Sequence, residues 1–237
     1  MRYDLAPSNA DPERMPPPLQ FPRFSAEKVS NGWAVAGAVF CALMLAVHVA
    51  GGLRSAGVLD FWRDMYWATV IANGERFPLS GPPINGLVEL GPWWFYVLAL
   101  PLWLTHRIAA AAAFLQLLAA LKYPLAWRLG TRLVDARFGL ALAVGLAVAG
   151  WSTSAFWFPS HPALVETTVL LLAFVVRRGW NRFGTATALL FGLAAAACLH
   201  AHPTTVLYIA AGGSMLLVRH RSWATLARLA LAAIVVL

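Results

Sequence analysis

The chain has 237 residues, of which 60% are hydrophobic and only 12% are charged, and its formal net charge is +8. A soluble domain of this length would carry about a quarter charged residues, so the composition excludes an ordinary soluble domain and predicts a unit whose solvent is largely lipid. The basic residues stand in short clusters between apolar runs. Positive-inside membrane topology explains such clusters more simply than nucleic-acid binding does. We therefore expect a membrane protein with no nucleic-acid partner.

The first 31 residues differ from the rest in being polar and proline-rich, with charges of both signs. They predict a disordered tail, 1–31, on the cytoplasmic side. This tail is too long and too acidic for the n-region of a cleaved signal peptide, so the first apolar run should remain as an anchor. The remainder, 32–237, is predicted to be one transmembrane module in which 53–107 forms an acidic outer loop. The last apolar run stops at Leu237 without a polar tail, so we expect a C-terminally truncated chain.

Apolar runs near the length of a membrane span, about 20 residues, recur along the chain. Arginine clusters within 128–137, 177–182 and 219–221 alternate with the formally uncharged connections 157–162 and 200–203. Positive-inside topology places the clusters in the cytoplasm and the uncharged connections outside. The pattern predicts an all-α fold, a polytopic membrane bundle of about seven transmembrane helices. The predicted crossings are 33–52, 108–127, 138–157, 162–176, 183–199, 203–218 and 223–237.

The apolar run 92–105 is interpreted differently. It is short, contains Pro101 and opens with the sequence WWFY, a composition typical of the membrane interface. A cytoplasmic tail and a cytoplasmic Arg128 require an odd number of crossings between the loop and that arginine. We therefore predict that 92–105 is a juxtamembrane helix along the outer interface. The alternative is that it crosses the membrane and that Arg128 lies outside.

Acidic residues concentrate in the outer loop. Of ten acids, four lie in the tail, and four of the other six are Asp60, Asp64, Glu75 and Glu89. Asp60 and Asp64 are four apart and would share one face of a helix. A carboxylate at the membrane surface can act as a general base toward a hydroxyl, or hold a divalent cation against a phosphate. The plainer interpretation is that any such loop is polar and that its aromatic residues only seat it in the headgroups.

The loop reads D-x-x-W-x-x-x-x-A-x-G-x-x-F-P-L-x-G-P, and a G-P-W-W-F-Y element and a helix ending in R-L-G-x-R follow it. This order resembles the GT-C class of membrane glycosyltransferases, and within it the protein mannosyltransferase and aminoarabinose transferase type. The resemblance implies transfer of a sugar from a polyprenyl-phosphate donor to an acceptor, of unknown identity, on the outer face of a bacterial inner membrane. This chain departs from the pattern at Asp64-Met65, where many members of the class carry a paired Asp-Glu.

The resemblance also implies roles for individual residues. Asp64 is the expected general base or metal-associated acid, with Asp60 as the second candidate. A divalent cation at Asp64 is the one cofactor considered, and the polyprenyl-phosphate donor and membrane lipid are the expected partners. The residues expected to contact substrate are Glu89, Arg76, Tyr66, Trp93, Trp94, Tyr96, Glu166 and His202.

Several of these residues have a structural interpretation as well. Glu166 lies inside a predicted span, where a carboxylate is functional by default, but a helix-packing hydrogen bond is an equal alternative. His200 and His202 could line the outer cleft, although without a third ligand they do not favour zinc. Arg63 is interpreted as balancing the neighbouring acids, whereas the role of Arg76 is left open.

The sequence also bears on functions other than glycosyl transfer. The chain contains no Walker A, G-x-G-x-x-G, H-E-x-x-H or C-x-x-C motif, which argues against ATP-driven, nicotinamide, zincin and thiol-redox functions. A secondary transporter is an alternative, and it typically has ionisable residues near the midplane of broken helices and an internal repeat. A non-catalytic subunit or remnant of a glycosyltransferase is the other alternative.

Overall fold

The computed structural model describes residues 31–55, 57, 59–84, 88–89, 91–149 and 159–236. The described part of the chain is helical apart from one antiparallel pair of two-residue strands, β1 (Pro83–Ile84) and β2 (Val88–Glu89). This confirms the predicted all-α class. The helices are α1 (Asn31–Arg54), α2 (Leu59–Ala72), α3 (Trp93–Thr105), α4 (Ile108–Ala120), α5 (Lys122–Leu133), α6 (Ala136–Val148), η2 (His161–Leu164), α8 (Val165–Asn181), α9 (Thr185–Ala201), η3 (Pro203–Thr205), α10 (Val206–His220) and α11 (Trp223–Val236).

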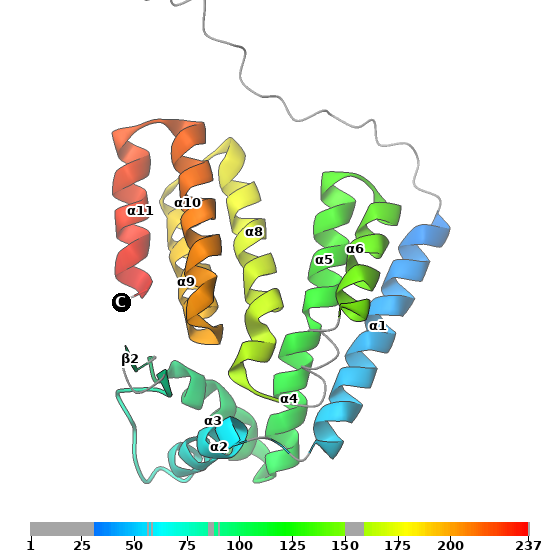
Figure 1. The fold of residues 1–237 in the computed structure, drawn as a ribbon, viewed down its shortest axis with the longest axis vertical. Helices are drawn as coiled ribbons and strands as arrows, with labels where there is room; N and C mark the ends of the chain where they lie inside the picture. Colours follow the sequence, from blue (N-terminus) through cyan, green and yellow to red (C-terminus); the bar gives the residue numbers. More distant parts are fainter. Residues whose placement is uncertain are drawn as a thin grey trace, which may run out of the picture.

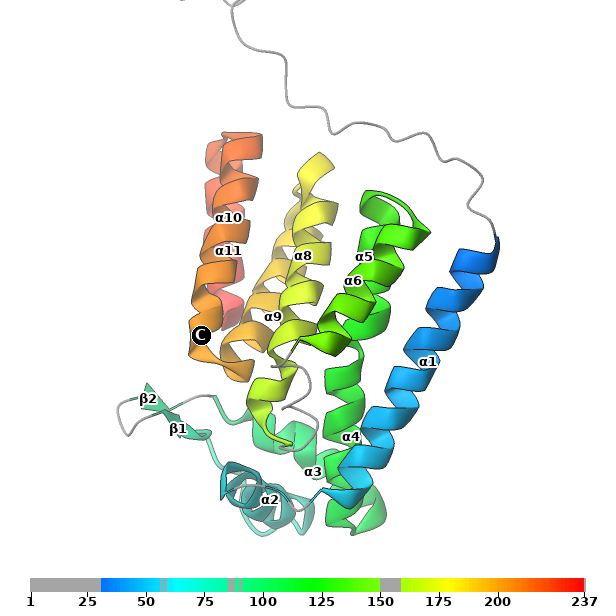
Figure 2. The same ribbon diagram turned by 45° about the vertical axis from the view of Figure 1, so that its right-hand side comes forward.

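The long helices lie side by side, and α2 and α3 gather at one end of them (Figure 1). The same arrangement is seen after rotation, where α2 runs across the end of the bundle (Figure 2). The α5–α6, α8–α9 and α10–α11 connections lie at the opposite end, and η2 and η3 lie at the end near α2 and α3. The last turns of α5, α8 and α10 carry Arg132, Arg178 and Arg219. The basic clusters and the acidic loop are therefore at opposite ends of the molecule.

Two helical segments are long and apolar enough to cross a membrane by length and composition. They are Gly32–Arg54, with 23 residues, and Ile108–Leu133, in which α4 continues into α5 over 26 residues. The other apolar helices found among the described residues are shorter, at 10–17 residues: Trp93–Thr105, Ala136–Val148, Thr185–Ala201 and Trp223–Ile234. The topology of seven crossings stays a prediction.

Several helix boundaries differ from those predicted. The run expected to end at 127 continues to Leu133, and the one expected to end at 176 continues to Asn181. Arginine is a good helix former and is favourable at a helix C-terminus, so the basic clusters extend the helices and do not interrupt them. The predicted crossing 138–157 corresponds to α6, and its part beyond 149 lies outside the described residues, as does the predicted tail up to residue 30.

Small residues set the closest approaches between helices. An added Cβ at Gly52 of α1 would stand 2.8 Å from the carbonyl oxygen of Ala112, in the alanine-rich start of α4. A Cβ at Gly130 of α5 would stand 2.6 Å from the Cα of Gly139 in α6. Such contacts let backbones pack directly, as is common between membrane helices.

This close approach predicts opposite effects for two glycine substitutions. Gly130→Ala should lower the free energy of unfolding by about 1–3 kcal/mol, because its methyl group meets backbone that cannot yield cheaply. Gly145→Ala in α6 meets no atom within 4 Å in the described part of the chain and should be neutral or stabilising by up to about 1 kcal/mol. Thermal or denaturant unfolding in detergent measures both. Equal effects of the two would contradict the α5–α6 packing.

Candidate functional site

The helices α2 and α3 share a core with α4 and η2 at one end of the bundle. Phe61 and Met65 of α2 and Trp94 of α3 are almost completely buried in it. Trp67 stacks on Phe95 with ring centroids 6.1 Å apart and an interplanar angle of 24°. The apolar contacts hold α2 against α3, and this places one acidic side chain of α2 inside the core.

That side chain is Asp64, which is 1% exposed. Its Oδ1 accepts hydrogen bonds from Arg63 Nε at 2.9 Å and from Arg63 Nη2 at 2.7 Å. Its Oδ2 accepts a hydrogen bond from Trp94 Nε1 at 2.8 Å. A buried carboxylate needs a cation and hydrogen-bond donors to offset its lost hydration. Here the cation Arg63 binds Oδ1, and Trp94 donates to Oδ2.

A third segment reaches the same carboxylate. His161, the first residue of η2, lies with Nδ1 3.5 Å from Asp64 Oδ2. The two atoms do not form a hydrogen bond, and this buried nitrogen has no hydrogen-bond partner among the described residues. The imidazole meets the Trp94 indole edge to face at 6.1 Å. Nothing in the position of His161 in the sequence indicated that it would approach Asp64.

The other predicted catalytic residue has a different environment. The side chain of Asp60 is 57% exposed and pairs with Arg63 Nη1 at 3.0 Å. Arg63 therefore contacts both acids, in agreement with its interpretation as their balancing charge. Asp60 and Asp64 do not form a pair of buried carboxylates, and only Asp64 lies within the core.

The aromatic residues expected to contact substrate lie around this core. Trp93 is at its surface, and its ring meets His200 of α9 edge to face at 5.1 Å. The Tyr96 hydroxyl donates a hydrogen bond to the Pro78 carbonyl oxygen at 3.1 Å and so ties α3 to the loop after α2. Tyr66 is exposed on α2.

The other residues that were expected to contact substrate do not interact with Asp64. Arg76 and Glu89 are exposed, and Glu89 belongs to β2. His202 binds Thr204 at the start of η3, with 2.8 Å between Nδ1 and Oγ1. Among the described residues, no hydrogen bond or ion pair joins these three side chains to Asp64.

Sequence reasoning missed one buried cation. Lys122 is 0% exposed, and its Nζ lies 3.5 Å from Glu166 Oε2 and 5.4 Å from the centre of the Tyr123 ring. His48 is hydrogen-bonded to Tyr123 and to Gln116 in the same region. The signal was present, because Lys122 is one of two lysines in the chain and stands inside an apolar run. Glu166 therefore has a packing partner, whichever other role it has.

The expected divalent cation was tested against these contacts. Asp64 receives three N–H donors, two on Oδ1 and one on Oδ2, so a cation would compete with them and would stand beside the positive charge of Arg63. In the described part of the chain, no group of three or more His, Cys, Asp or Glu side chains is placed to hold a metal ion. The residues around Asp64 thus do not fit a metal site, and no chemical step is derived through one.

Comparison of the chain with protein-family models, with curated proteins and with solved structures finds no match. The resemblance to the GT-C class accordingly rests on the sequence elements quoted above.

The contact between Trp94 and Asp64 predicts energetic coupling. In a double-mutant cycle of Trp94→Phe and Asp64→Asn, we expect a coupling energy of about 1–3 kcal/mol, because the first change removes the donor and the second removes the charge of a buried charge-assisted hydrogen bond. Unfolding in detergent gives the four free energies of the cycle. A control cycle of Asp64→Asn with Trp103→Phe, at an exposed position of α3, should show no coupling. Equal coupling in both cycles would contradict the contact.

Proposed function

We propose that this chain is a multi-pass membrane glycosyltransferase of the GT-C type, with Asp64 as its general base. It would move a sugar from a polyprenyl-phosphate donor to an acceptor at the extracytoplasmic face of a plasma (inner) membrane. The observation that carries the proposal is a buried carboxylate, held by Arg63 and Trp94, at the end of the molecule opposite the basic clusters.

The membrane location is supported by charge and by surface composition. The basic ends of α5, α8 and α10 lie together, as positive-inside topology requires of the cytoplasmic side. The outward face of α1 exposes Val35, Val39 and Leu43. Neighbouring exposed apolar side chains of this kind mark a surface that is covered by lipid or by another protein. With the basic ends in the cytoplasm, the N-terminus of α1 is cytoplasmic and Asp64 faces outward.

The contacts of Asp64 limit how the proposed reaction would proceed. The acceptor hydroxyl oxygen would attack the anomeric carbon of the donor, the bond from that carbon to the phosphate oxygen would break, and polyprenyl phosphate would leave with the electron pair. The hydroxyl proton would pass to Asp64. Because Arg63 occupies Oδ1, the acceptor would approach Oδ2, where Trp94 donates and His161 stands near. Catalytic hydrogen bonds often form only in the substrate complex, so this side must open on binding.

The remaining predicted residues keep the roles that the resemblance implies. Trp93 and Tyr66 present exposed aromatic surface on α3 and α2, suited to the sugar or to the lipid part of the donor. Arg76 has an exposed cationic side chain that could bind a donor phosphate through paired N–H groups. Neither role depends on a divalent cation.

A secondary transporter is the second candidate, and one observation favours it. The ion pair of buried Lys122 and partly buried Glu166 lies between α5 and α8, and Lys122 belongs to the candidate span Ile108–Leu133. Ionisable residues inside membrane segments commonly mark ion or substrate pathways. The acidic and aromatic end of the bundle has no evident part in such a mechanism, so the glycosyltransferase accounts for more of the chain.

The proposed topology predicts which positions a membrane-impermeant thiol reagent reaches in intact cells. Cys41 and Cys198 are buried and would first be replaced by alanine. A cysteine at exposed Ser80, in the loop after α2, should then be labelled, whereas a cysteine at exposed Val134, between α5 and α6, should be labelled only after the cells are permeabilised. The reverse pattern would invert the topology. Labelling of both positions in intact cells would contradict the proposal that the chain spans the membrane.

The proposed general base predicts a large effect of one substitution on turnover. Asp64→Asn removes the charge that accepts the proton and should reduce kcat by about 10²–10⁴-fold. Asp60→Asn removes an exposed carboxylate and should have a much smaller effect. The assay follows sugar release from a polyprenyl-phosphate donor in liposomes, at equal amounts of folded protein. Near-normal turnover of Asp64→Asn would show that the loop only seats the chain in the membrane, and would make the Lys122–Glu166 ion pair the stronger functional candidate.

A further inference from the structure

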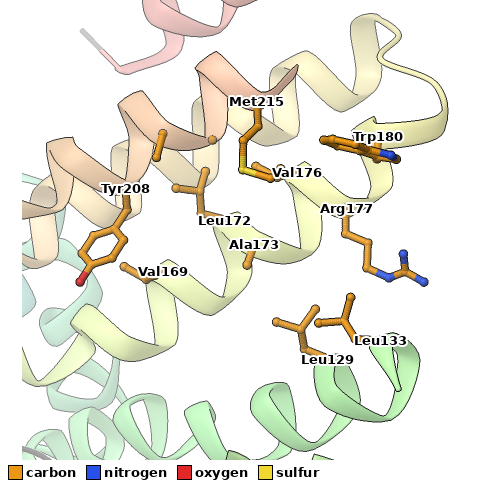
Figure 3. A pocket seen from close by; sticks show the side chains of 12 residues that line it. Leu129, Leu133, Val169, Leu172, Ala173, Val176, Arg177, Trp180, Tyr208 and Met215 are labelled. Carbon is orange, nitrogen blue, oxygen red and sulfur yellow. The ribbon is translucent and has the colours of Figure 1, made fainter. Parts of the chain in front are cut away.

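An apolar groove with a volume of about 300 Å³ lies between α8, α5 and α10 (Figure 3), and Asp64 is not among the residues that line it. Val169, Leu172 and Val176 line it from α8, Leu129 from α5, and Tyr208 and Met215 from α10. Along α8 the lining runs from Val169 to Trp180, which is about 16 Å at 1.5 Å per residue. Its shape and lining suit a hydrocarbon chain.

The groove meets a basic pocket at one end. This second pocket, of about 660 Å³, is lined by Arg132, Arg177, Arg178 and Asn181 among others, and Arg177 lines the groove as well. Arg177 Nη2 donates to the carbonyl oxygen of Arg132 at 3.2 Å, and the Arg132 guanidinium lies 5.7 Å from the centre of the Phe174 ring. Within the described part of the chain, none of these three arginines forms an ion pair with a carboxylate.

We propose that the groove and the basic pocket together bind one anionic phospholipid. One acyl chain would lie along α8 in the groove, and the phosphate would accept hydrogen bonds from Arg177 and Arg178. Basic pockets between helices at the cytoplasmic side of a bundle bind anionic headgroups for this reason, and guanidinium groups match phosphate oxygens geometrically. The inference rests on the proposed membrane location but not on glycosyl transfer.

The charge distribution favours a phospholipid over other occupants. A helix of another protein, or another part of this chain, could fill the apolar groove, but it would cover the arginines without neutralising them unless it also carried acids there. Burying unpaired charges is costly. A phospholipid has its apolar and anionic parts in the same order as the groove and the pocket. It therefore satisfies both without further assumptions.

Lipid retention in native mass spectrometry would test the headgroup half of the site. The full chain, freed of lipid in a neutral detergent, should bind one phosphatidylglycerol more tightly than a phosphatidylcholine with the same acyl chains. Arg177→Gln with Arg178→Gln should weaken phosphatidylglycerol binding by about 25-fold, roughly fivefold for each charge. The control pair Arg128→Gln with Arg137→Gln removes the same charge from the same end of the bundle, outside both pockets. Equal binding of the two lipids, or equal loss in the control, would overturn the proposal.

A second pair of variants would test the groove. Ala211→Phe places a ring in the groove from α10 and should weaken the binding of both lipids at least tenfold, while Ala210→Phe places the same ring on an exposed position outside it. Unchanged binding by the Ala211 variant would overturn the proposal. Asp64→Asn should bind lipid normally. The experiments can thus contradict the lipid site and the proposed sugar transfer independently of each other. The thiol labelling described above tests the membrane location separately.

Discussion

The carboxylate of Asp64 joins two helices that are far apart in the sequence and lies beside a third segment. It sits on α2 and accepts hydrogen bonds from its neighbour Arg63 and from Trp94 of α3, while His161 of η2 stands beside it. A carboxylate that is 1% exposed is tolerated only with hydrogen-bond donors on both oxygens, so the placement of α3 against α2 is constrained by it. The apolar core supplies the attraction between these elements, and the carboxylate makes one arrangement of them preferable to others that would bury similar area.

The same constraint recurs one turn further along the chain. His161 precedes α8 and points toward Asp64, and Glu166 in the first turn of α8 lies 3.5 Å from the buried ammonium of Lys122. The start of α8 thus joins the end of the bundle, where α2 and α3 pack, to the interior between α5 and α8. A displacement of this start would disturb both buried charges.

The sequence predicted those features that depend on composition or on short spacing. The alternation of charged and uncharged connections predicted that the arginine clusters would lie at one end of the bundle. The aromatic run after Pro92 predicted where α3 begins. The pairing of Asp64 with Trp94 spans 30 residues, and its approach to His161 is longer still, so both depend on packing that no local pattern encodes. Lys122 differs from them. A lysine in an apolar run needs an anionic partner, and Glu166 is the one carboxylate inside a predicted span. The Lys122–Glu166 ion pair could therefore have been predicted from the cost of an unpaired charge in a membrane helix.

The length of α8 explains why Glu166 needs that partner. From Glu166 to Arg177 the helix rises about 16 Å, whereas the hydrocarbon core of a bilayer is about 30 Å thick. If the arginines lie at the cytoplasmic headgroups, Glu166 falls near the middle of the bilayer and not at its outer surface. Lys122 stands ten residues before Arg132 on α5 and reaches a similar depth, where it can neutralise the carboxylate. His161 begins the short helix η2 that precedes α8, so it lies nearer the outer surface than Glu166 does, beside Asp64 and Trp94. The same geometry that keeps one carboxylate paired in the interior therefore places the other nearer the outer surface, which is the side that the proposed donor requires.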